Sequence, residues 1–320
     1  MDIRQLRYFC EIAKQGSFSA AAKTLGLAQP TLSHQIAVLE QDLDTRLFHR
    51  TTQGVSLTGA GQLLVQEAAE IITSLDRVTA LVRGYGREPA GDVTIGLPSS
   101  VSMVLSVPLA ETVRIELPDV RLKVIEAMSG HIQNWLEDRS IDMGFLYDVP
   151  HGTALQADEM VREGLGFLSA PDAWPFDNPS GSPVSLADLA SVELVLPSRS
   201  HGLRRMLDQA AADAGITLDV PVEMDALAQI KAMVSRGSGF TVLSSAAAFD
   251  FVSRGELIMA PIATPRLDRP VYLVRHSAGV KTPAALAVEQ LIATVLEDLV
   301  GRGIWQAESQ MTLAEAAHGE

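Results

Sequence analysis

The fold of the N-terminal part is decided by residues 17–50, which read SFSAAAKTLGLAQPTLSHQIAVLEQDLDTRLFHR. Ser17 is a good N-cap for a short helix that contains the alanine run, and Gly26 ends that helix in a tight turn. A second helix opens on Gln29 and Pro30, because the first turn does not need the N–H that proline lacks. A basic, turn-rich segment follows. This order predicts a winged helix-turn-helix.

The exposed face of the second helix predicts contacts with DNA. Leu32, Ile36 and Leu39 form its buried stripe. In a helix-turn-helix, the first residues of the second helix reach base edges in the major groove. Glutamine can bond adenine through two hydrogen bonds, serine can bond several bases, and a threonine methyl can contact thymine. The candidate residues on this face are Gln29, Pro30, Ser33 and His34, with Thr31 at its margin.

The sequence allows more than one role for two of the candidate DNA-binding residues, His34 and Arg50. His34 can bond a guanine or a phosphate, or it can be a solvated surface residue. Arg50 follows Leu47 and Phe48, which anchor the segment after the helix in the core. Arg50 can therefore contact a phosphate or enter the minor groove of DNA. The alternative is that it forms a surface salt bridge within the protein.

The charge of the chain is divided unevenly. The 320 residues have a formal net charge of -14, although residues 1–58 hold six Lys and Arg against five Asp and Glu. The remainder is therefore strongly acidic, and an acidic surface repels the DNA backbone. Only the N-terminal part should contact DNA, and its weak charge favours binding by two or more copies.

The segment from Leu6 to Gly61 resembles the LysR-type transcriptional regulators. The resemblance is carried, in order, by LRYF, GSFSAAA, AQPTLS, LE, LFHR and LTGAG. The family often has Ser where this chain has Ala28, and Arg where it has His34. The resemblance implies a DNA-binding regulator whose C-terminal domain has the two-lobed fold of periplasmic solute-binding proteins.

A long linker helix is predicted next, with Thr58 as its cap. Apolar residues recur in it at alternating spacings of four and three, at Leu64, Ala68, Ile71, Leu75, Val78 and Val82. Such a heptad seam predicts a partner helix and hence a dimer, whereas the alternative is packing against the chain's own C-terminal domain. Residues 84–91 then form a hinge-like stretch.

The rest of the chain alternates strand-like and helical stretches, which predicts an α/β domain with parallel sheets and helices on both faces. The chain then divides into a winged helix-turn-helix (1–58), a linker helix with hinge (59–90), an effector-binding domain (91–305) and a tail (306–320). Lobe I of the effector-binding domain takes about 91–147 and 269–305, and lobe II about 155–263, with crossovers near 147–155 and 263–269.

Ligands of such sheets bind beyond the carboxyl ends of the strands, where helices begin. The candidate residues at those ends are Ser99, Ser100, Ser129, Arg199 and His201. Hydroxyls, helix N–H groups and these charges suit a small anionic effector, such as a carboxylate or amino acid. The resemblance supports the three serines, because regulators of this family hold small carboxylates at such positions. The alternative is that the serines only cap helices.

The sequence lacks the motifs of enzymes and metal sites: it has no Gly-x-Ser-x-Gly, no P-loop and no paired histidines at metal spacing. We therefore expect no catalytic residue, metal or cofactor. Cys10 is the only cysteine and the N-terminus has no apolar signal core, which favours the cytoplasm. The longest uncharged run, Val93–Ala110, contains two prolines and is a poor membrane span.

Three hypotheses follow. The first is a transcriptional regulator that binds double-stranded DNA as a dimer or tetramer, contacts RNA polymerase and responds to a small anionic metabolite between its lobes. The second is a regulator of the same family without an effector, and residues 196–205 resemble its nitrogen-assimilation-control branch. The third is a solute-binding protein, but the intact wing argues against this hypothesis.

Overall fold

The computed structural model describes residues 1–51, 54–84, 88–148, 154–277 and 282–310. The chain divides into two compact units. We call them the head, which is Met1–Tyr85 with Gly279–Thr282, and the body, which is Gly86–Ala278 with Pro283–Glu320. No helix among the described residues is long and apolar enough to cross a membrane.

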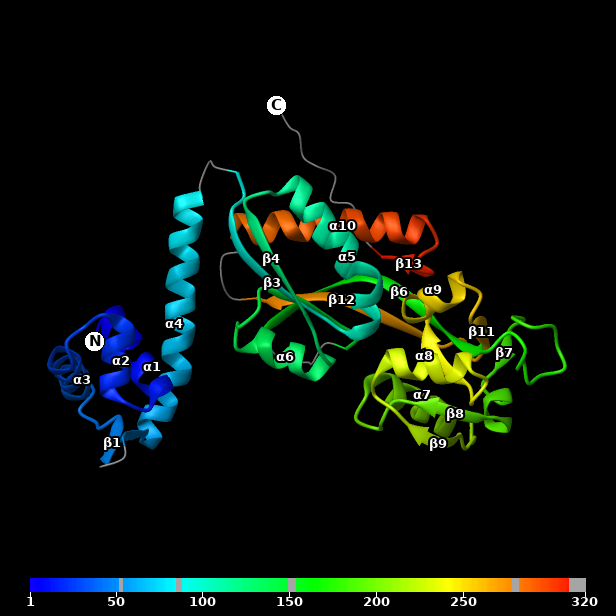
Figure 1. Cartoon of the computed structure of the whole chain (residues 1–320), viewed down its shortest axis with the longest axis horizontal. Coiled ribbons are helices and arrows are strands. Elements are labelled where there is room, and N and C mark those ends of the chain that lie inside the picture. Colours follow the sequence, from blue (N-terminus) through cyan, green and yellow to red (C-terminus); the bar gives the residue numbers. More distant parts are fainter. Residues whose placement is uncertain (52–53, 85–87, 149–153, 278–281, 311–320) are drawn as a thin grey trace. The chain divides into compact units, whose positions relative to one another are not determined.

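The head is a small helical domain with a hairpin wing and a long final helix (Figure 1). Its elements are α1 (Ile3–Gln15), α2 (Phe18–Leu25), α3 (Gln29–Asp42), β1 (Phe48–Thr51), β2 (Gly54–Leu57) and α4 (Gly59–Gly84). The stripe of Leu32, Ile36 and Leu39 is fully buried, and it packs with Phe9 and Phe48 in one core. The predicted winged helix-turn-helix is therefore confirmed.

The helix ends of the head follow from local chemistry. The Ser17 hydroxyl accepts a hydrogen bond from the Ala20 N–H at 3.3 Å, and the Thr58 hydroxyl accepts one from the Gly61 N–H at 3.0 Å. Gly26 ends α2 with a φ of 66°, a conformation that glycine adopts without strain. These contacts confirm both predicted caps and the predicted turn.

Two glycines let the wing and α4 approach the rest of the head backbone to backbone. A Cβ on Gly61 would lie 2.2 Å from the Leu47 carbonyl oxygen. A Cβ on Gly54, whose φ is 137°, would lie 2.7 Å from the carbonyl oxygen of Gly16. Both positions therefore require glycine for close packing.

The apolar residues of α4 fall into two groups, which corrects the predicted seam. Ala68 is fully buried and Leu64 packs against the head core, so the head itself uses the first turns of the helix. The later seam residues remain exposed within one chain, with exposed fractions between 41% and 72%; they are Ile71, Leu75, Val78 and Val82.

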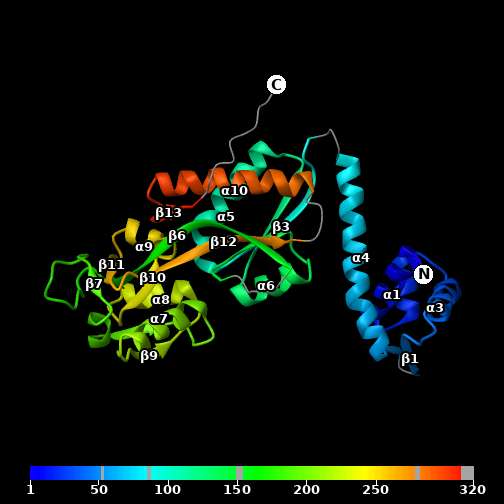
Figure 2. The ribbon, with the colours of Figure 1, turned by 180° about the vertical axis from the view of Figure 1, so that it is seen from behind.

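The body has two lobes, each with its own hydrophobic core (Figures 1 and 2). Lobe I contains β3 (Gly91–Leu97), α5 (Ser99–Glu116), β4 (Val120–Glu126), α6 (Ser129–Glu137), β5 (Met143–Leu146), α10 (Pro283–Gly301) and β13 (Ala307–Ser309). Lobe II contains β7 (Val184–Ser185), a short 3-10 helix (Asp188–Ser191), β8 (Glu193–Leu196), α7 (Gly202–Asp213), β9 (Asp219–Glu223), α8 (Leu227–Ser235), β10 (Thr241–Ser244), α9 (Ser245–Ser253) and β11 (Ile258–Thr264).

Two long strands join the lobes. β6 (Leu155–Ser169) pairs with β12 (Asp268–His276) over its first part and with β10 and β11 over its last part. The chain crosses to lobe II along β6 and returns along β12, so these neighbours run antiparallel. The predicted two-lobed α/β fold is confirmed, but its sheets are mixed: β3, β4 and β5 are parallel, and so are β8 and β9.

Several element boundaries differ from the sequence-based expectation. The continuous apolar run predicts a strand only over residues 164–168, whereas β6 begins at Leu155, and its first residues alternate half-buried and exposed side chains as a half-buried strand does. Part of the tail expected from residue 306 is ordered as β13, which pairs with β6. Residues 149–153 of the first crossover, 85–87 of the hinge and 311–320 of the tail lie outside the described residues.

Candidate functional site

The first turn of α3 presents an exposed surface on the head. The exposed side chains are Gln29, Pro30, Thr31 and His34, and Ser33 is half-buried. Nε2 of Gln29 donates to the Ser33 hydroxyl at 2.9 Å, so these two side chains form one polar unit. Within the described part of the chain, no side chain caps this helix at Ala28. Its first N–H groups are therefore able to bind a phosphate.

A buried carboxylate holds the wing against α3. Glu40 accepts hydrogen bonds from the N–H groups of Leu47 at 2.8 Å and Phe48 at 3.3 Å, and from Arg46 at 2.8 Å. Burial opposes the charged form, but these donors outweigh it and hold the pKa of Glu40 below its ordinary value. Sequence reasoning did not single out Glu40, because its donors become its neighbours only after the chain turns.

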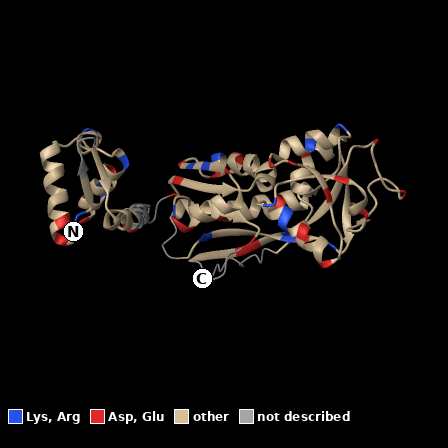
Figure 3. Cartoon of the chain, turned by 90° about the horizontal axis from the view of Figure 1, so that it is seen from below, with Lys and Arg blue, Asp and Glu red and all other residues tan. Residues whose placement is uncertain are grey.

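Arg50 lies on β1, opposite Val55 of β2. Its side chain lies outside the described part of the structure, so its predicted contact with phosphate or the minor groove remains a prediction. Figure 3 shows acidic positions on many helices and strands of the body. This pattern agrees with the unequal division of charge in the sequence.

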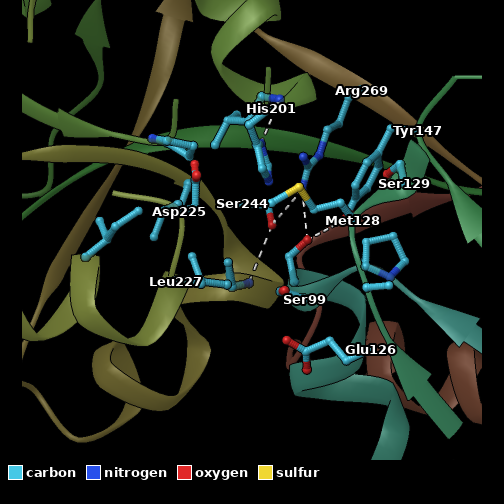
Figure 4. Close-up of a pocket in the computed structure, with 18 residues that line it drawn as sticks. Ser99, Glu126, Met128, Ser129, Tyr147, His201, Asp225, Leu227, Ser244 and Arg269 are labelled. Carbon is cyan, nitrogen blue, oxygen red and sulfur yellow. Dashed lines mark hydrogen bonds between the residues drawn. The ribbon is translucent and has the colours of Figure 1, made fainter. Parts of the chain in front are cut away.

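The body contains a cavity of about 250 Å³ lined by residues of both lobes (Figure 4). Ser99, Ser100 and Ser129 line it from lobe I, and His201 lines it from lobe II. Arg199 is exposed and is not among the lining residues. The structure thus brings four of the five candidate residues to one place, and their role as effector ligands remains a prediction.

Helix N-termini converge on this cavity. The lining residues that open or precede a helix are Ser99 (α5), Ser129 (α6), His201 (α7), Leu227 (α8) and Ser244 (α9). His201 and Ser244 cap their own helices through side-chain atoms. Among the described residues, no side chain caps α5, α6 or α8. Each helix start carries a partial positive charge and N–H donors, so the arrangement favours an anionic group.

A buried arginine that sequence reasoning missed also lines the cavity. The Arg269 side chain is 7% exposed, and its Nη2 lies 2.6 Å from Oε1 of the fully buried Glu163. The same Nη2 donates to the hydroxyls of Ser100 at 3.1 Å and Ser244 at 3.3 Å. The guanidinium therefore joins β12 to β6 and to the starts of α5 and α9.

Two further groups hold this arginine in place. The guanidinium lies over the Tyr147 ring, 3.8 Å from its centroid, and the Tyr147 hydroxyl shares a hydrogen bond with the Ser100 hydroxyl. Burial raises the pKa of Tyr147 above its ordinary value, so its hydroxyl keeps its proton. Below the pair, Nε1 of the buried Trp305 donates to Oε2 of Glu163 at 2.6 Å.

His201 is held as a neutral donor. Its Nδ1 accepts a hydrogen bond from the Leu203 N–H at 3.2 Å, so the ring proton of the neutral form is on Nε2. Burial, and next the charge of Arg269, lower the pKa of His201 below its ordinary value. Figure 4 shows the ring between Asp225 and Arg269.

Asp225 is another polar residue of lobe II that lines the cavity and that sequence reasoning missed. Its Oδ1 accepts a hydrogen bond from the Ser198 N–H at 2.8 Å. This bond is the main cause that lowers the pKa of Asp225, so the carboxylate stays charged at neutral pH.

Two family profiles match the chain. The profile of bacterial regulatory helix-turn-helix proteins of the lysR family matches residues 3–62, and that of the LysR substrate binding domain matches residues 86–297. Among similar curated proteins, the nitrogen assimilation regulatory protein nac of Klebsiella aerogenes is 29% identical over 92% of this chain and 95% of its own. The uncharacterized HTH-type transcriptional regulator YnfL of Escherichia coli (strain K12) is 30% identical over 89% of this chain and 95% of its own.

Solved structures show the same fold. A full-length OxyR variant from Pseudomonas aeruginosa superposes with a TM-score of 0.73 at 20% identity, covering 98% of this chain and 99% of its own. Full-length CbnR complexed with its target DNA gives a TM-score of 0.61 at 22% identity, covering 92% and 99%. With both domains matched in order, the chain belongs to the LysR family of bacterial transcriptional regulators, as a DNA-binding regulator with a C-terminal effector-binding domain.

Proposed function

We propose that this regulator reads its operator with α3 and its wing. Gln29 and Ser33 contact base edges in the major groove, Thr31 and His34 flank them, and Pro30 sets the first turn. Arg50 contacts phosphate or the minor groove. The proposal is supported by the exposed, uncapped start of α3 and by the buried stripe on its opposite face.

The cavity of the body is proposed to bind a small metabolite through an anionic group of that ligand. The convergence of the N-termini of α5 to α9 on one cavity is the observation that carries this proposal. Ser99, Ser100 and Ser129 would donate from lobe I, and His201 from lobe II. The ligand would then contact both lobes and favour one spacing between them.

Regulation further requires that the ligand bind two arrangements of the protein with unequal affinity, since equal affinity shifts no equilibrium. We propose a homodimer through the exposed stripe of α4 and a tetramer through the bodies. A regulator of this kind would act in the cytoplasm, where bacterial DNA lies, with RNA polymerase as a further partner.

Thermal unfolding of the full chain with a panel of small carboxylic acids and amino acids tests the ligand proposal. We expect one or more of these compounds to raise the melting temperature, and the triple variant Ser99→Ala, Ser129→Ala, His201→Ala to lose that rise. A rise that survives in the triple variant would place the site elsewhere. No rise across the panel would favour the regulator without an effector.

Selection of binding sites from random duplex DNA tests the DNA proposal. We expect the full chain to enrich one motif with two related half-sites, because a symmetric dimer reads a symmetric operator. Equal recovery of unrelated sequences would contradict sequence-specific binding.

A further inference from the structure

The fixed charges at the cavity have a negative excess, which restricts the charge that a ligand can carry. The charged residues that line the cavity are Glu126, Asp225 and Arg269. Glu163 lies beneath them and is fully buried against Arg269. The positive charge of Arg269 is therefore already neutralised, while two carboxylates remain at the cavity. A ligand that carries only negative charge would face both of them.

His201 does not correct this imbalance. Its Nδ1 accepts from the Leu203 N–H, and its half-buried ring lies beside the Arg269 guanidinium, which opposes a second positive charge there. The neutral imidazole offers one N–H donor and no net charge. The anionic part of a ligand must therefore depend on the helix starts and their hydroxyls. On the lobe I side these are the uncapped starts of α5 and α6, with Ser99, Ser100 and Ser129.

Asp225 offers a matching site for a cation on the lobe II side. The Ser198 N–H fixes one of its oxygens at 2.8 Å, so the carboxylate is oriented before a ligand arrives. Figure 4 shows Asp225 beside His201, whereas Glu126 lies at the lower edge of the drawn residues. Both side chains are exposed, but among the described residues no hydrogen bond or ion pair reaches the Glu126 carboxylate, whereas the Ser198 N–H donates to that of Asp225. Of the two carboxylates, Asp225 is the one held in place.

We infer that the effector is a zwitterion, a carboxylate that also carries an ammonium group, and that Asp225 binds the ammonium while Ser99 and Ser129 with their helix starts bind the carboxylate. This inference rests on the proposed function of the cavity as a small-molecule site. A zwitterion satisfies both signs of charge and spans the two lobes. Charge-assisted hydrogen bonds at each end give it preference over a simple anion.

The test compares matched probes on the full chain by titration calorimetry. The probes are the proteinogenic amino acids, their N-acetyl derivatives, which keep only the carboxylate, and their amides, which keep only the ammonium. We expect at least one amino acid to bind about tenfold or more tightly than both of its derivatives, because each derivative loses one charged hydrogen-bonding group. Asp225→Asn should weaken the binding of that amino acid about tenfold and leave its N-acetyl derivative unchanged.

Glu126→Gln is the matched control, since it also removes one carboxylate from the cavity lining. It should leave the preference for the amino acid over its N-acetyl derivative intact. If Glu126→Gln removes the preference and Asp225→Asn does not, the assignment of Asp225 is overturned. If N-acetyl derivatives bind as tightly as the amino acids, the zwitterion is overturned while the small-molecule site stands. If no probe binds, the proposed function of the cavity fails, and this inference with it.

Discussion

Glu163 and Arg269 form a buried ion pair at the cavity, and individual hydrogen bonds fix the groups around it. Arg269 donates to Ser244, which also caps α9 by accepting from the Ala247 N–H at 3.4 Å. Burying two charges is costly unless they are paired and hydrogen-bonded, and here Trp305 and Ser100 supply the additional bonds. Glu163 thus holds Arg269 beside the helix starts, and the pair as a whole adds no net charge to the cavity.

Glu163→Gln should destabilise the body strongly. The substitution leaves the Arg269 charge buried without its counter-ion, which costs about 3–5 kcal/mol of unfolding free energy. Chemical denaturation of the purified full chain measures this cost. Glu308→Gln is the control, because Glu308 pairs with Arg266 at 2.8 Å on the surface, where both side chains are 58% exposed. It should cost about 0–1 kcal/mol. Equal losses in the two variants would contradict the role given to Glu163.

Gln29→Ala should weaken operator binding by about 1–3 kcal/mol and relax the preference at one base pair, because it removes a side chain that can bond adenine twice. The measurement is a mobility-shift titration against the selected operator and its single-base variants. Gln41→Ala is the control, since Gln41 is an exposed glutamine near the other end of the same helix. An unchanged affinity for Gln29→Ala would show that α3 docks differently.

His201 should make the body less stable in acid. Its pKa in the folded protein lies below the ordinary value of 6.5, so below about pH 6.5 the unfolded chain binds a proton that the folded chain resists. The free energy of unfolding therefore falls as the pH drops through this window. His201→Asn keeps a capping side chain at the start of α7 and removes the titrating group.

Urea unfolding above and below this pH measures the effect. The loss of stability on acidification should be smaller in His201→Asn than in the unsubstituted chain. His131→Asn serves as the control, because His131 is exposed on α6. A loss of equal size in all three proteins would rule out the lowered pKa of His201 as its cause.

At the scale of elements, the two halves of α4 have different apolar surfaces. Its first turns close the core of the head through Leu64 and Ala68, and its later turns expose an apolar stripe. The stripe starts at Ile71 and continues at heptad spacing through Leu75, which is 41% exposed, to Val82, which is 72% exposed. An apolar stripe at this spacing is typical of a helix that pairs with a partner helix.

Leu75→Lys should dissociate the dimer, because the lysine charge would be buried without a partner in the seam. Light scattering at micromolar concentration measures the mass. Leu63→Lys is the control, since Leu63 is 61% exposed on α4 but does not belong to the heptad positions. It should leave the dimer intact. An unsubstituted chain that is already monomeric would contradict pairing through α4.

At the scale of the whole molecule, the arrangement of the two lobes is what would couple the proposed ligand to the shape of the body. The lobes have separate cores, and the chain passes between them along β6 and back along β12. The cavity is lined from both sides of this junction. A ligand that bonds to both lobes therefore biases their relative position, and a population shift between two assemblies can alter how the heads engage DNA.

We expect a ligand that raises the melting temperature to change the electrophoretic mobility or the footprint of the operator complex. The change should be lost in the double variant Ser99→Ala, Ser129→Ala, which should still bind operator without ligand. A ligand that binds the body tightly and leaves the footprint unchanged would separate ligand binding from regulation.

The sequence by itself determined the head. The cap hydroxyls of Ser17 and Thr58 accept from N–H groups three residues ahead, and the Gly26 N–H donates to carbonyls three and four residues back, so these effects are readable as local pattern. The buried stripe of α3 follows from helical spacing alone. The sequence also located four residues of the cavity, because strand ends and helix starts of an α/β fold meet at one edge.

Only the tertiary structure decided what surrounds those residues. Glu163 and Arg269 are separated by 106 positions, and Ser100 and Tyr147 by 47, so no local pattern joins them. The antiparallel pairing of β6 with β12 brings the ion pair together, and the convergence of helix starts from both lobes adds Asp225 and Ser244. Spacing along the chain sets which face of an element a side chain occupies. The charge balance of a site depends on which faces meet, and long-range packing decides that.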